Sequence, residues 1–311
     1  MIKYLTFILI LTIKFNLYAQ NLDSLKPNKK PIKTYYFKSK WSVKNACLKS
    51  IYAFNKQTVK LSKALSNTKD WELVFFDEFD SLDTKKWRLG QAWGEFHPDH
   101  LHQYYSKNDV VVNNGTLKLM GSYRPKSFKL KDSNIIIPYS VGLINSDISF
   151  KQKYGYFEIR SKNPKGPATL PAFWLSGANR WPPEIDIFEM YGKKTGKNIH
   201  NQYATIHWGK SGTKSRGYLT KKINLPNNTD TAFHVYACEW SPKFIKFYTD
   251  GKLVNSIRVN KRLRKWLDDE MVVIINNCFE AQYVNYLGSD FKSNFFEVDY
   301  VRVYQRKKIK N

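Results

Sequence analysis

Residues 181–192 of this 311-residue chain read Trp-Pro-Pro-Glu-Ile-Asp-Ile-Phe-Glu-Met-Tyr-Gly. Three acids, Glu184, Asp186 and Glu189, lie in apolar sequence that favours a β-strand. Side chains alternate along a regular strand, so Glu184 and Asp186 share one face and Glu189 points to the other. One extra residue at Ile187-Phe188, a β-bulge, returns Glu189 to the first face. The stretch therefore predicts three acids along one strip of a sheet.

Such a strip of acids has little structural use, because like charges repel and carboxylates beside apolar residues are costly to desolvate. It suits glycoside hydrolysis, which uses one carboxylate as nucleophile and one carboxylic acid as proton donor, roughly 5–5.5 Å apart in retaining enzymes. The alternative is a solvated edge strand that happens to be acidic. The flanking residues favour a sugar groove over a wetted edge: Trp174, Trp181, Met190 and Tyr191.

The composition describes a basic chain that can bury a large core. Hydrophobic residues make up 42%, aromatic residues 16%, and the net charge is +25. Residues 71–311 hold 37 of the basic and 24 of the acidic residues, a net charge of +13. A basic surface can indicate nucleic acid, an anionic membrane or an acidic polymer, or simply a lysine-rich surface with no ligand behind it.

The N-terminal residues 1–19 read as an export signal. Lys3 supplies the positive start, residues 4–13 the apolar run, and Leu17-Tyr18-Ala19 a small-residue cleavage site. The apolar run is too short to span a bilayer. We therefore expect an exported protein, periplasmic or extracellular, with no membrane insertion and no nucleic-acid partner. Residues 20–68 are predicted to be a basic linker with a helical segment.

Cys47, Cys238 and Cys278 form an odd set of three cysteines. Export permits one disulfide, and Cys238–Cys278 is the pair we would test, although sequence alone leaves the pairing open. No cluster of cysteine and histidine indicates a structural zinc.

From residue 71 onward, short β-favouring runs alternate with turn residues, which predicts an all-β fold: a two-sheet antiparallel β-sandwich over residues 69–307. Asn113-Asn-Gly115 and Asp250-Gly251 are hairpin turn signals. Residues 261–269 read as a short helix. The expected strands are 71–76, 110–112, 116–120, 143–150, 155–161, 172–175, 204–208, 234–240, 245–249, 272–275 and 296–304.

Several segments together resemble glycoside hydrolase family 16, in the bacterial branch of laminarinases, agarases, porphyranases and carrageenases. The resemblance spans about residues 71–305. It implies a β-jelly-roll whose concave sheet holds a long, open, endo-acting cleft. The segments that carry it are 71–80, 82–87, 103–105, 154–160, 170–175, 184–189, 236–240, 247–251 and 298–304.

By this resemblance, Glu184 is the nucleophile, Glu189 the general acid and then the general base, and Asp186 the residue that orients and tunes them. The extra residue between Asp186 and Glu189 is similar to the bulged members of the family. Those members include laminarinases and red-algal galactan hydrolases, and exclude the lichenase and xyloglucan groups.

Substrate-binding candidates combine aromatic rings with a few polar side chains, since a pyranose packs its apolar face on a flat ring. Trp93 and Tyr104 fall in a loop, residues 90–106, that many relatives use to wall a cleft. The alternative for His207 is a structural role, and the alternative for Arg180 is an ordinary role at the surface. The candidates are Trp174, Trp181, His207, Trp208, Trp93, Tyr104 and Arg180.

Some family members bind a structural calcium away from the cleft, partly through an acid near a C-terminal motif, which here reads Asp-Tyr-Val-Arg-Val-Tyr over residues 299–304. Asp299 is the matching position here, and Glu78 is a second candidate ligand. No cofactor is expected for catalysis.

The sequence thus predicts a secreted, retaining endo-glycosidase, a monomer whose partner is a β-linked polysaccharide. A neutral β-1,3-glucan such as laminarin is favoured by residues 71–87. A sulfated or anhydro-galactan such as carrageenan, porphyran or agar is favoured by the positive charge. The alternative is a non-catalytic, carbohydrate-binding jelly roll for glycan capture, although such a groove has no need of three clustered acids.

Overall fold

The computed structural model describes residues 70–210, 217–225 and 228–307. The chain divides into two units, Met1–Val59 and Lys60–Asn311, and every described residue belongs to the second. The predicted export signal, the basic linker with its helical segment, and Cys47 lie outside the described residues. Within the described ranges, no helix has the length and apolarity needed to cross a membrane.

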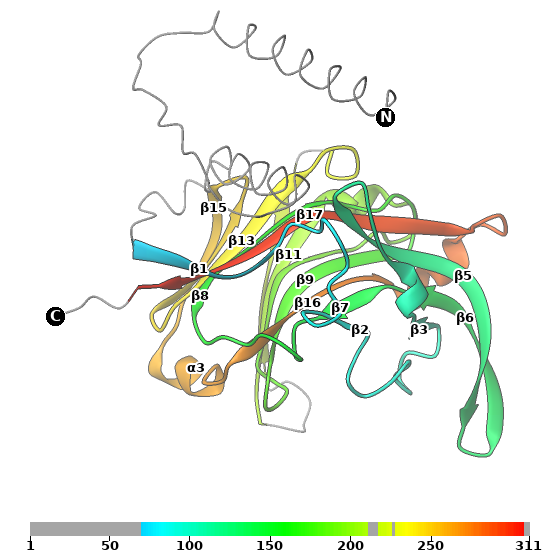
Figure 1. Cartoon of the computed structure of the whole chain (residues 1–311), viewed down its shortest axis with the longest axis horizontal. Coiled ribbons are helices and arrows are strands. Elements are labelled where there is room, and N and C mark those ends of the chain that lie inside the picture. The colour runs from blue at the N-terminus through cyan, green and yellow to red at the C-terminus, as the bar shows by residue number, and fades with distance from the viewer. Residues whose placement is uncertain (1–69, 211–216, 226–227, 308–311) are drawn as a thin grey trace, which may run out of the picture. The chain divides into compact units, whose positions relative to one another are not determined.

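Two sheets make up almost all of the described chain, which confirms the predicted all-β, two-sheet class (Figure 1). The larger, ten-stranded sheet has the order β15-β14-β13-β8-β17-β5-β6-β3, with β1 beside β17 and β4 beside β5. Its strands pair antiparallel except for β3 and β6, which run parallel. Its members are β1 (Trp71–Asp77), β3 (Gln103–Tyr105), β4 (Val110–Asn113), β5 (Thr116–Leu130), β6 (Ser133–Val141), β8 (Gly155–Lys162), β13 (His234–Trp240), β14 (Phe244–Thr249), β15 (Lys252–Arg258) and β17 (Ser293–Arg306).

The seven-stranded sheet has the order β12-β11-β10-β9-β16-β7-β2 and is antiparallel throughout. Its strands are β2 (Arg88–Leu89), β7 (Leu143–Asn145), β9 (Thr169–Gly177), β10 (Glu184–Met190), β11 (Asn201–Trp208), β12 (Gly217–Asn224) and β16 (Met271–Phe279). The short helices of the described residues are η3 (Lys107–Asp109), η4 (Lys197–His200), α3 (Lys261–Trp266) and η5 (Ala281–Tyr286).

Strand β16 shows how the period of two divides the seven-stranded sheet into a core face and an outer face. Val273 and Ile275 join the main hydrophobic core, together with residues of the ten-stranded sheet. Val272 and Ile274 belong to a separate small cluster. All of β16 is nevertheless buried. The outer face is therefore packed as well, in part by side chains such as Tyr105 of β3 and Trp174 of β9.

Both predicted hairpins form, and their turns use the residues that the sequence indicated. Asn114 and Gly115 have φ values of 55° and 71°, and the turn joins β4 to β5. Asp250 and Gly251 have φ values of 49° and 74°, and the turn joins β14 to β15. Two successive positive φ angles match the twist of the flanking strands.

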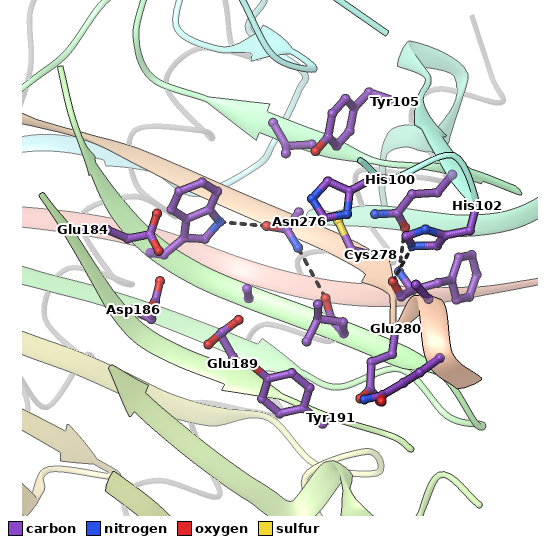
Figure 2. Close-up of a pocket in the computed structure, with 18 residues that line it drawn as sticks. His100, His102, Tyr105, Glu184, Asp186, Glu189, Tyr191, Asn276, Cys278 and Glu280 are labelled. Carbon is purple, nitrogen blue, oxygen red and sulfur yellow. Dashed lines mark hydrogen bonds between the residues drawn. The ribbon is translucent and has the colours of Figure 1, made fainter. Parts of the chain in front are cut away.

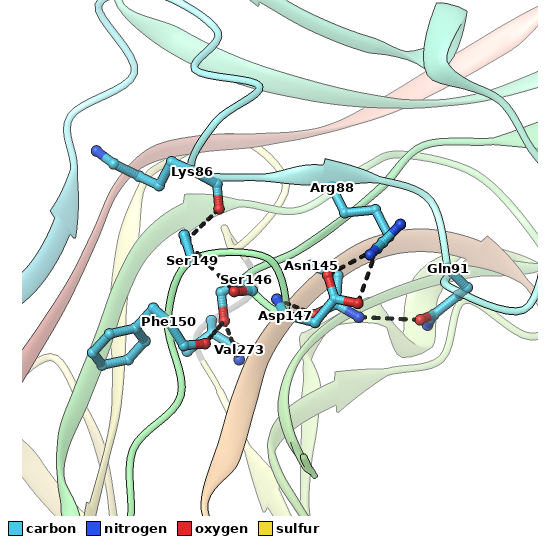
Figure 3. A network of polar contacts seen from close by, with 9 residues as sticks. All are labelled: Lys86, Arg88, Gln91, Asn145, Ser146, Asp147, Ser149, Phe150 and Val273. Atoms are coloured by element: carbon cyan, nitrogen blue, oxygen red, sulfur yellow. Dashed lines mark hydrogen bonds and ion pairs between the residues drawn. The ribbon is translucent and has the colours of Figure 1, made fainter. Parts of the chain in front are cut away.

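The predicted strand 143–150 ends early, at Asn145. The Ser146 hydroxyl donates to the carbonyl of Phe150 at 2.8 Å and accepts from the backbone N–H of Val273 at 2.9 Å (Figure 3). A side chain that bonds nearby backbone in this way competes with a sheet ladder, so the chain turns here. Conversely, β5 and β6 extend well past residue 120 as a long hairpin (Figure 1).

The suggested disulfide between Cys238 and Cys278 is absent, because both cysteines are free and buried. Cys238 lies on β13, within the core between the sheets, whereas Cys278 lies on β16 in a different cluster. Burial raises the pKa of both thiols, so neither is poised to ionise.

Candidate active site

The one-residue bulge predicted in the acidic stretch is present in β10. Asp186 pairs with Thr205 of β11, but Glu189 pairs with Tyr203, so three steps along β10 match two along β11. Ile187 and Phe188 consequently both enter the hydrophobic core, where each is fully buried. The acids are left on the opposite face, where all three line one pocket (Figure 2).

Glu184 has two polar neighbours that stabilise its ionised form. Its Oε2 accepts a hydrogen bond of 2.8 Å from the indole N–H of Trp181. Its Oε1 lies 3.6 Å from Nε2 of His207, which sits opposite Glu184 in the β10–β11 ladder. The same imidazole nitrogen lies 3.4 Å from Oδ2 of Asp186. His207 thus bridges the first two acids.

Burial raises the pKa of all three carboxyl groups above the ordinary range. The pKa of Glu184 rises to about 8, through burial first and then the charge of Asp186. That of Asp186 is raised well above its usual value by burial and by Glu189. Burial also raises the pKa of Glu189, against the opposing effects of Tyr191 and His207. The cluster therefore keeps protons at neutral pH and holds carboxylic acid beside carboxylate.

The acids face a groove made of two adjoining cavities, of about 440 and 1300 Å³. His100, Tyr105, Trp174 and Glu184 line both cavities, so the two are continuous. The floor is the outer face of β7, β9, β10 and β16, and the walls come from loops on either side. Figure 2 shows the three acids on one side of the smaller cavity and His100, His102 and Tyr105 on the other.

Three of the predicted tryptophans lie along this groove. Trp174 lines both cavities, and its indole N–H donates to Oδ1 of Asn276 at 2.7 Å. Trp93 and Trp181 line the larger cavity and remain exposed, at 57% and 43% of their surface. Exposed rings beside a groove are the surface on which a sugar ring can stack.

Three other candidates lie elsewhere. Tyr104 is buried, and its hydroxyl donates to the carbonyl of Arg124, while the adjacent Tyr105 points into the groove. Arg180 donates to the carbonyls of Pro182 and Trp266, so its guanidinium fixes the loop before β10. Neither Tyr104 nor Arg180 lines the groove.

Trp208 packs against the hydrophobic core from the end of β11 and lines neither cavity. Its indole lies over Gly217, where an added Cβ would approach the ring to 2.5 Å. The period of two explains the placement: Trp208 follows His207, which faces the acids, so it points away from them.

The two acids proposed as calcium ligands are each paired with an arginine. Asp299 lies 2.6 Å from Arg160, and both oxygens of Glu78 accept bonds of 2.7 Å from Arg302. A guanidinium already supplies the positive charge at each carboxylate. These residues do not fit a calcium site, since a cation would have to displace an arginine from each of them.

Sequence reasoning did not assign Asn276 or Cys278 to the groove, and it placed His102 only in the loop of residues 90–106 that was expected to wall the cleft. Asn276 and Cys278 face it from β16, and alternation from the buried Val273 and Ile275 would have placed them there. His102 Nε2 bonds the carbonyl of Phe279 at 2.9 Å, and burial lowers the pKa of that histidine. No local signal could have found this contact, because it spans 177 residues.

A polar network holds the loop that carries Trp93 (Figure 3). The side-chain amide of Asn145 donates to Oε1 of Gln91 at 3.2 Å, and Arg88 binds both oxygens of Asp147 at 2.9 Å. Gln91, Asn145 and Asp147 also line the larger cavity. The network therefore anchors the start of the loop at the edge of the groove.

Comparison with known proteins gives one family match, to the model described as glycosyl hydrolases family 16, over residues 98–300. The β-glucanase of Rhodothermus marinus is 31% identical over 268 residues, which cover 76% of this chain and 85% of that protein. The endo-1,3-1,4-β-glycanase ExsH of Rhizobium meliloti is 30% identical over 201 residues. That match covers 58% of this chain but only 41% of ExsH.

Among solved structures, the catalytic domain of an endo-1,3-β-glucanase (laminarinase) from Thermotoga petrophila superposes with a TM-score of 0.62 at 26% identity. The superposition covers 77% of this chain and 99% of that domain. The two-sheet architecture is therefore shared over nearly the whole of the solved domain.

The raised pKa of Glu184 predicts that the active-site acids destabilise the fold at alkaline pH. The folded state holds a proton up to about pH 8, whereas an unfolded glutamate loses it near its ordinary pKa. The contribution of Glu184 to the free energy of unfolding is therefore present at low pH. It is lost as the pH rises from the ordinary pKa of a glutamate to about 8.

We therefore expect Glu184→Gln to raise the melting temperature at pH 8 by roughly 5 °C, and to have little effect near pH 4.5. Glu72→Gln, on the exposed face of β1, is the control, and it should leave the melting temperature unchanged at both pH values. Thermal unfolding followed by circular dichroism at both pH values makes the measurement. An equal effect of Glu184→Gln at both pH values would contradict the assigned ionisation.

Proposed function

This chain belongs to glycosyl hydrolases family 16, and we propose that it is an exported endo-β-glucanase that cleaves a neutral β-1,3-linked glucan with retention of configuration. The observation that carries the proposal is the bulged strand β10, which directs three acids into an open groove with exposed tryptophans. Export rests on the pattern of residues 1–19. The named relatives, a β-glucanase and a laminarinase, support the substrate class.

In the proposed reaction, Glu184 is the nucleophile. Its carboxylate attacks the anomeric carbon while the carboxylic acid of Glu189 protonates the glycosidic oxygen, and the bond to the leaving sugar breaks. Glu189, now ionised, takes a proton from water as that water attacks the same carbon and releases Glu184. Two inversions at one carbon give net retention.

The hydrogen-bond donors around the acids support this division of roles. Trp181 and His207 both stabilise a negative charge on Glu184. Protons held by Glu189 and Asp186 also remove the two neighbouring charges that raise the pKa of Glu184. The first step uses the microstate in which Glu184 is ionised while Glu189 and Asp186 hold protons, and its population grows as the pH approaches the Glu184 pKa of about 8.

The groove supports a neutral substrate over a sulfated one. Neither cavity is lined by lysine or arginine among the described residues. The larger cavity adds the acids Glu95, Asp99 and Asp147 to those already described, and the smaller adds Glu280. The nearest cations are already paired with two of these acids, Arg88 with Asp147 and Lys126 with Glu95, so a sulfate group would have to compete with a carboxylate for each of them. The positive charge of the chain thus gives no support to a sulfated galactan.

The roles of the two glutamates can be separated by azide rescue on an activated aryl β-glycoside of a β-1,3-glucan oligosaccharide. Glu184→Ala and Glu189→Ala should each lower turnover at least about 1000-fold. In Glu184→Ala, azide can fill the space of the nucleophile and should give the α-glycosyl azide. In Glu189→Ala, azide should attack the glycosyl-enzyme and give the β-azide. Near-normal activity, or the opposite anomers by NMR, would refute the assignment.

Salt dependence tests the charge of the substrate. We expect the KM for laminarin to change less than about twofold between 50 and 500 mM NaCl, because a neutral chain has no screened charge. Carrageenan and porphyran should yield no new reducing ends. Cleavage of either, with a KM that rises steeply with salt, would instead favour a sulfated galactan. Binding to laminarin without cleavage would favour a glycan-capture protein.

Trp181→Phe tests the donor on the nucleophile. Loss of the indole N–H should raise the pKa of Glu184 and move the acidic limb of the kcat–pH profile upward by about one unit. Trp93→Phe is the matched control, since this ring lines the groove without a hydrogen bond to the acids. It should change KM and leave the limb in place. Equal profiles for both variants would show that the Trp181 donor has no effect.

A further inference from the structure

Two acids that line the smaller cavity and the histidine beside them on β11 form a group that can hold a metal ion. Glu184, Asp186 and His207 each offer one ligand atom, and these atoms all lie within 4.8 Å of one another. Imidazole Nε2 lies 3.6 Å from an oxygen of Glu184 and 3.4 Å from Oδ2 of Asp186. It is the one group of three or more such side chains found in the described part of the chain.

The separations agree with the size of a small tetrahedral ion. Zinc binds imidazole nitrogen and carboxylate oxygen at about 2.0–2.2 Å. Two ligands of a tetrahedral ion at these distances are therefore roughly 3.3–3.5 Å apart. The two imidazole–carboxylate distances lie at or close to that value, and the separation of the two carboxylate oxygens is at most 4.8 Å. Two carboxylates and one imidazole supply three of the four ligands of a tetrahedral ion, and a water would supply the fourth.

Asp186 supplies an independent indication that a ligand belongs here. Only 3% of its surface is exposed, and its Oδ2 is buried with no hydrogen-bond partner among the described residues. That atom is the one nearest to Nε2 of His207. A buried carboxylate oxygen left without a donor is costly, and a cation would remove the cost.

We propose that the substrate-free groove binds one divalent transition-metal ion, Zn²⁺ or Cu²⁺, between Glu184, Asp186 and His207, and that this ion excludes substrate. The site uses side chains of the proposed hydrolysis but can be tested without turnover. A metal on the Glu184 carboxylate occupies the lone pair that would attack the anomeric carbon. Inhibition is therefore competitive with the glycan.

The donor set selects against the common hard cations. Magnesium demands six oxygen ligands in octahedral geometry, and calcium takes six to eight. Imidazole suits zinc and copper instead, and copper is the tighter of the two in the usual affinity order.

The test is isothermal titration calorimetry of the full-length chain, stripped with a chelator, with ZnCl₂ and then MgCl₂ as titrant at pH 7. We expect one zinc site with a Kd of about 1–10 µM and no magnesium binding. His207→Gln and Glu184→Gln should each weaken zinc binding at least about tenfold. Zinc should also raise the KM for laminarin without changing kcat.

His100→Gln is the matched control, because His100 lines the same groove close to His97 and His102 but lies outside the proposed site. The His100→Gln variant should bind zinc with the same affinity as the unsubstituted chain. Loss of binding in His100→Gln with retention in His207→Gln would move the site to that histidine cluster and overturn the proposal. So would the absence of zinc binding below 100 µM.

Circular dichroism checks that each variant is folded, and Asp186→Asn replaces any variant that is not. Zinc binding without hydrolysis of any glycan would support the metal site and contradict the proposed function. Hydrolysis without zinc binding would do the reverse.

Discussion

Strand β10 satisfies two opposed demands, the burial of apolar side chains and the presentation of acids to a groove. The extra residue lets Ile187 and Phe188 both enter the core, where each contributes roughly 1.5–3 kcal/mol by burial. That gain offsets part of the cost of holding Glu184, Asp186 and Glu189 away from water, a cost seen in their raised pKa values. Without the bulge, Glu189 would point into the hydrophobic core.

The neighbouring elements hold the groove in shape around this strand. Asn276 of β16 fixes the indole of Trp174, and His207 of β11 reaches two of the acids. Loop contacts act from further away: Gln103 accepts the backbone N–H of Phe279 at 2.7 Å, and Asn145 holds Gln91. Each contact orients a side chain that faces the groove, so the site is built on a sheet and secured by its loops.

The charge of the chain and the charge of its groove have opposite signs. The +25 net charge comes from lysines and arginines distributed over the sequence, whereas the described lining of the groove contains acids and no basic side chain other than histidine. Net charge is a property of the surface as a whole and affects solubility and non-specific binding. Only the placement of individual side chains can decide which substrate a groove accepts.

The sequence alone determined the features that depend on near neighbours along the chain. The period of two, the extra residue at Ile187-Phe188 and the turns at Asn113-Asn-Gly115 and Asp250-Gly251 are local patterns, and the sheets, the bulge and the hairpins follow from them. A strand one residue out of phase presents its other face, which is why Tyr105 rather than Tyr104 lines the groove.

The tertiary structure alone decided the pairings between distant residues. Cys238 and Cys278 lie in separate clusters, Glu78 and Asp299 are each paired with an arginine, and Asn276 binds Trp174 across 102 positions of sequence. Such contacts depend on which strands become neighbours and in which register. The order of strands within a sheet follows from packing of the whole core, and no short stretch of residues encodes it.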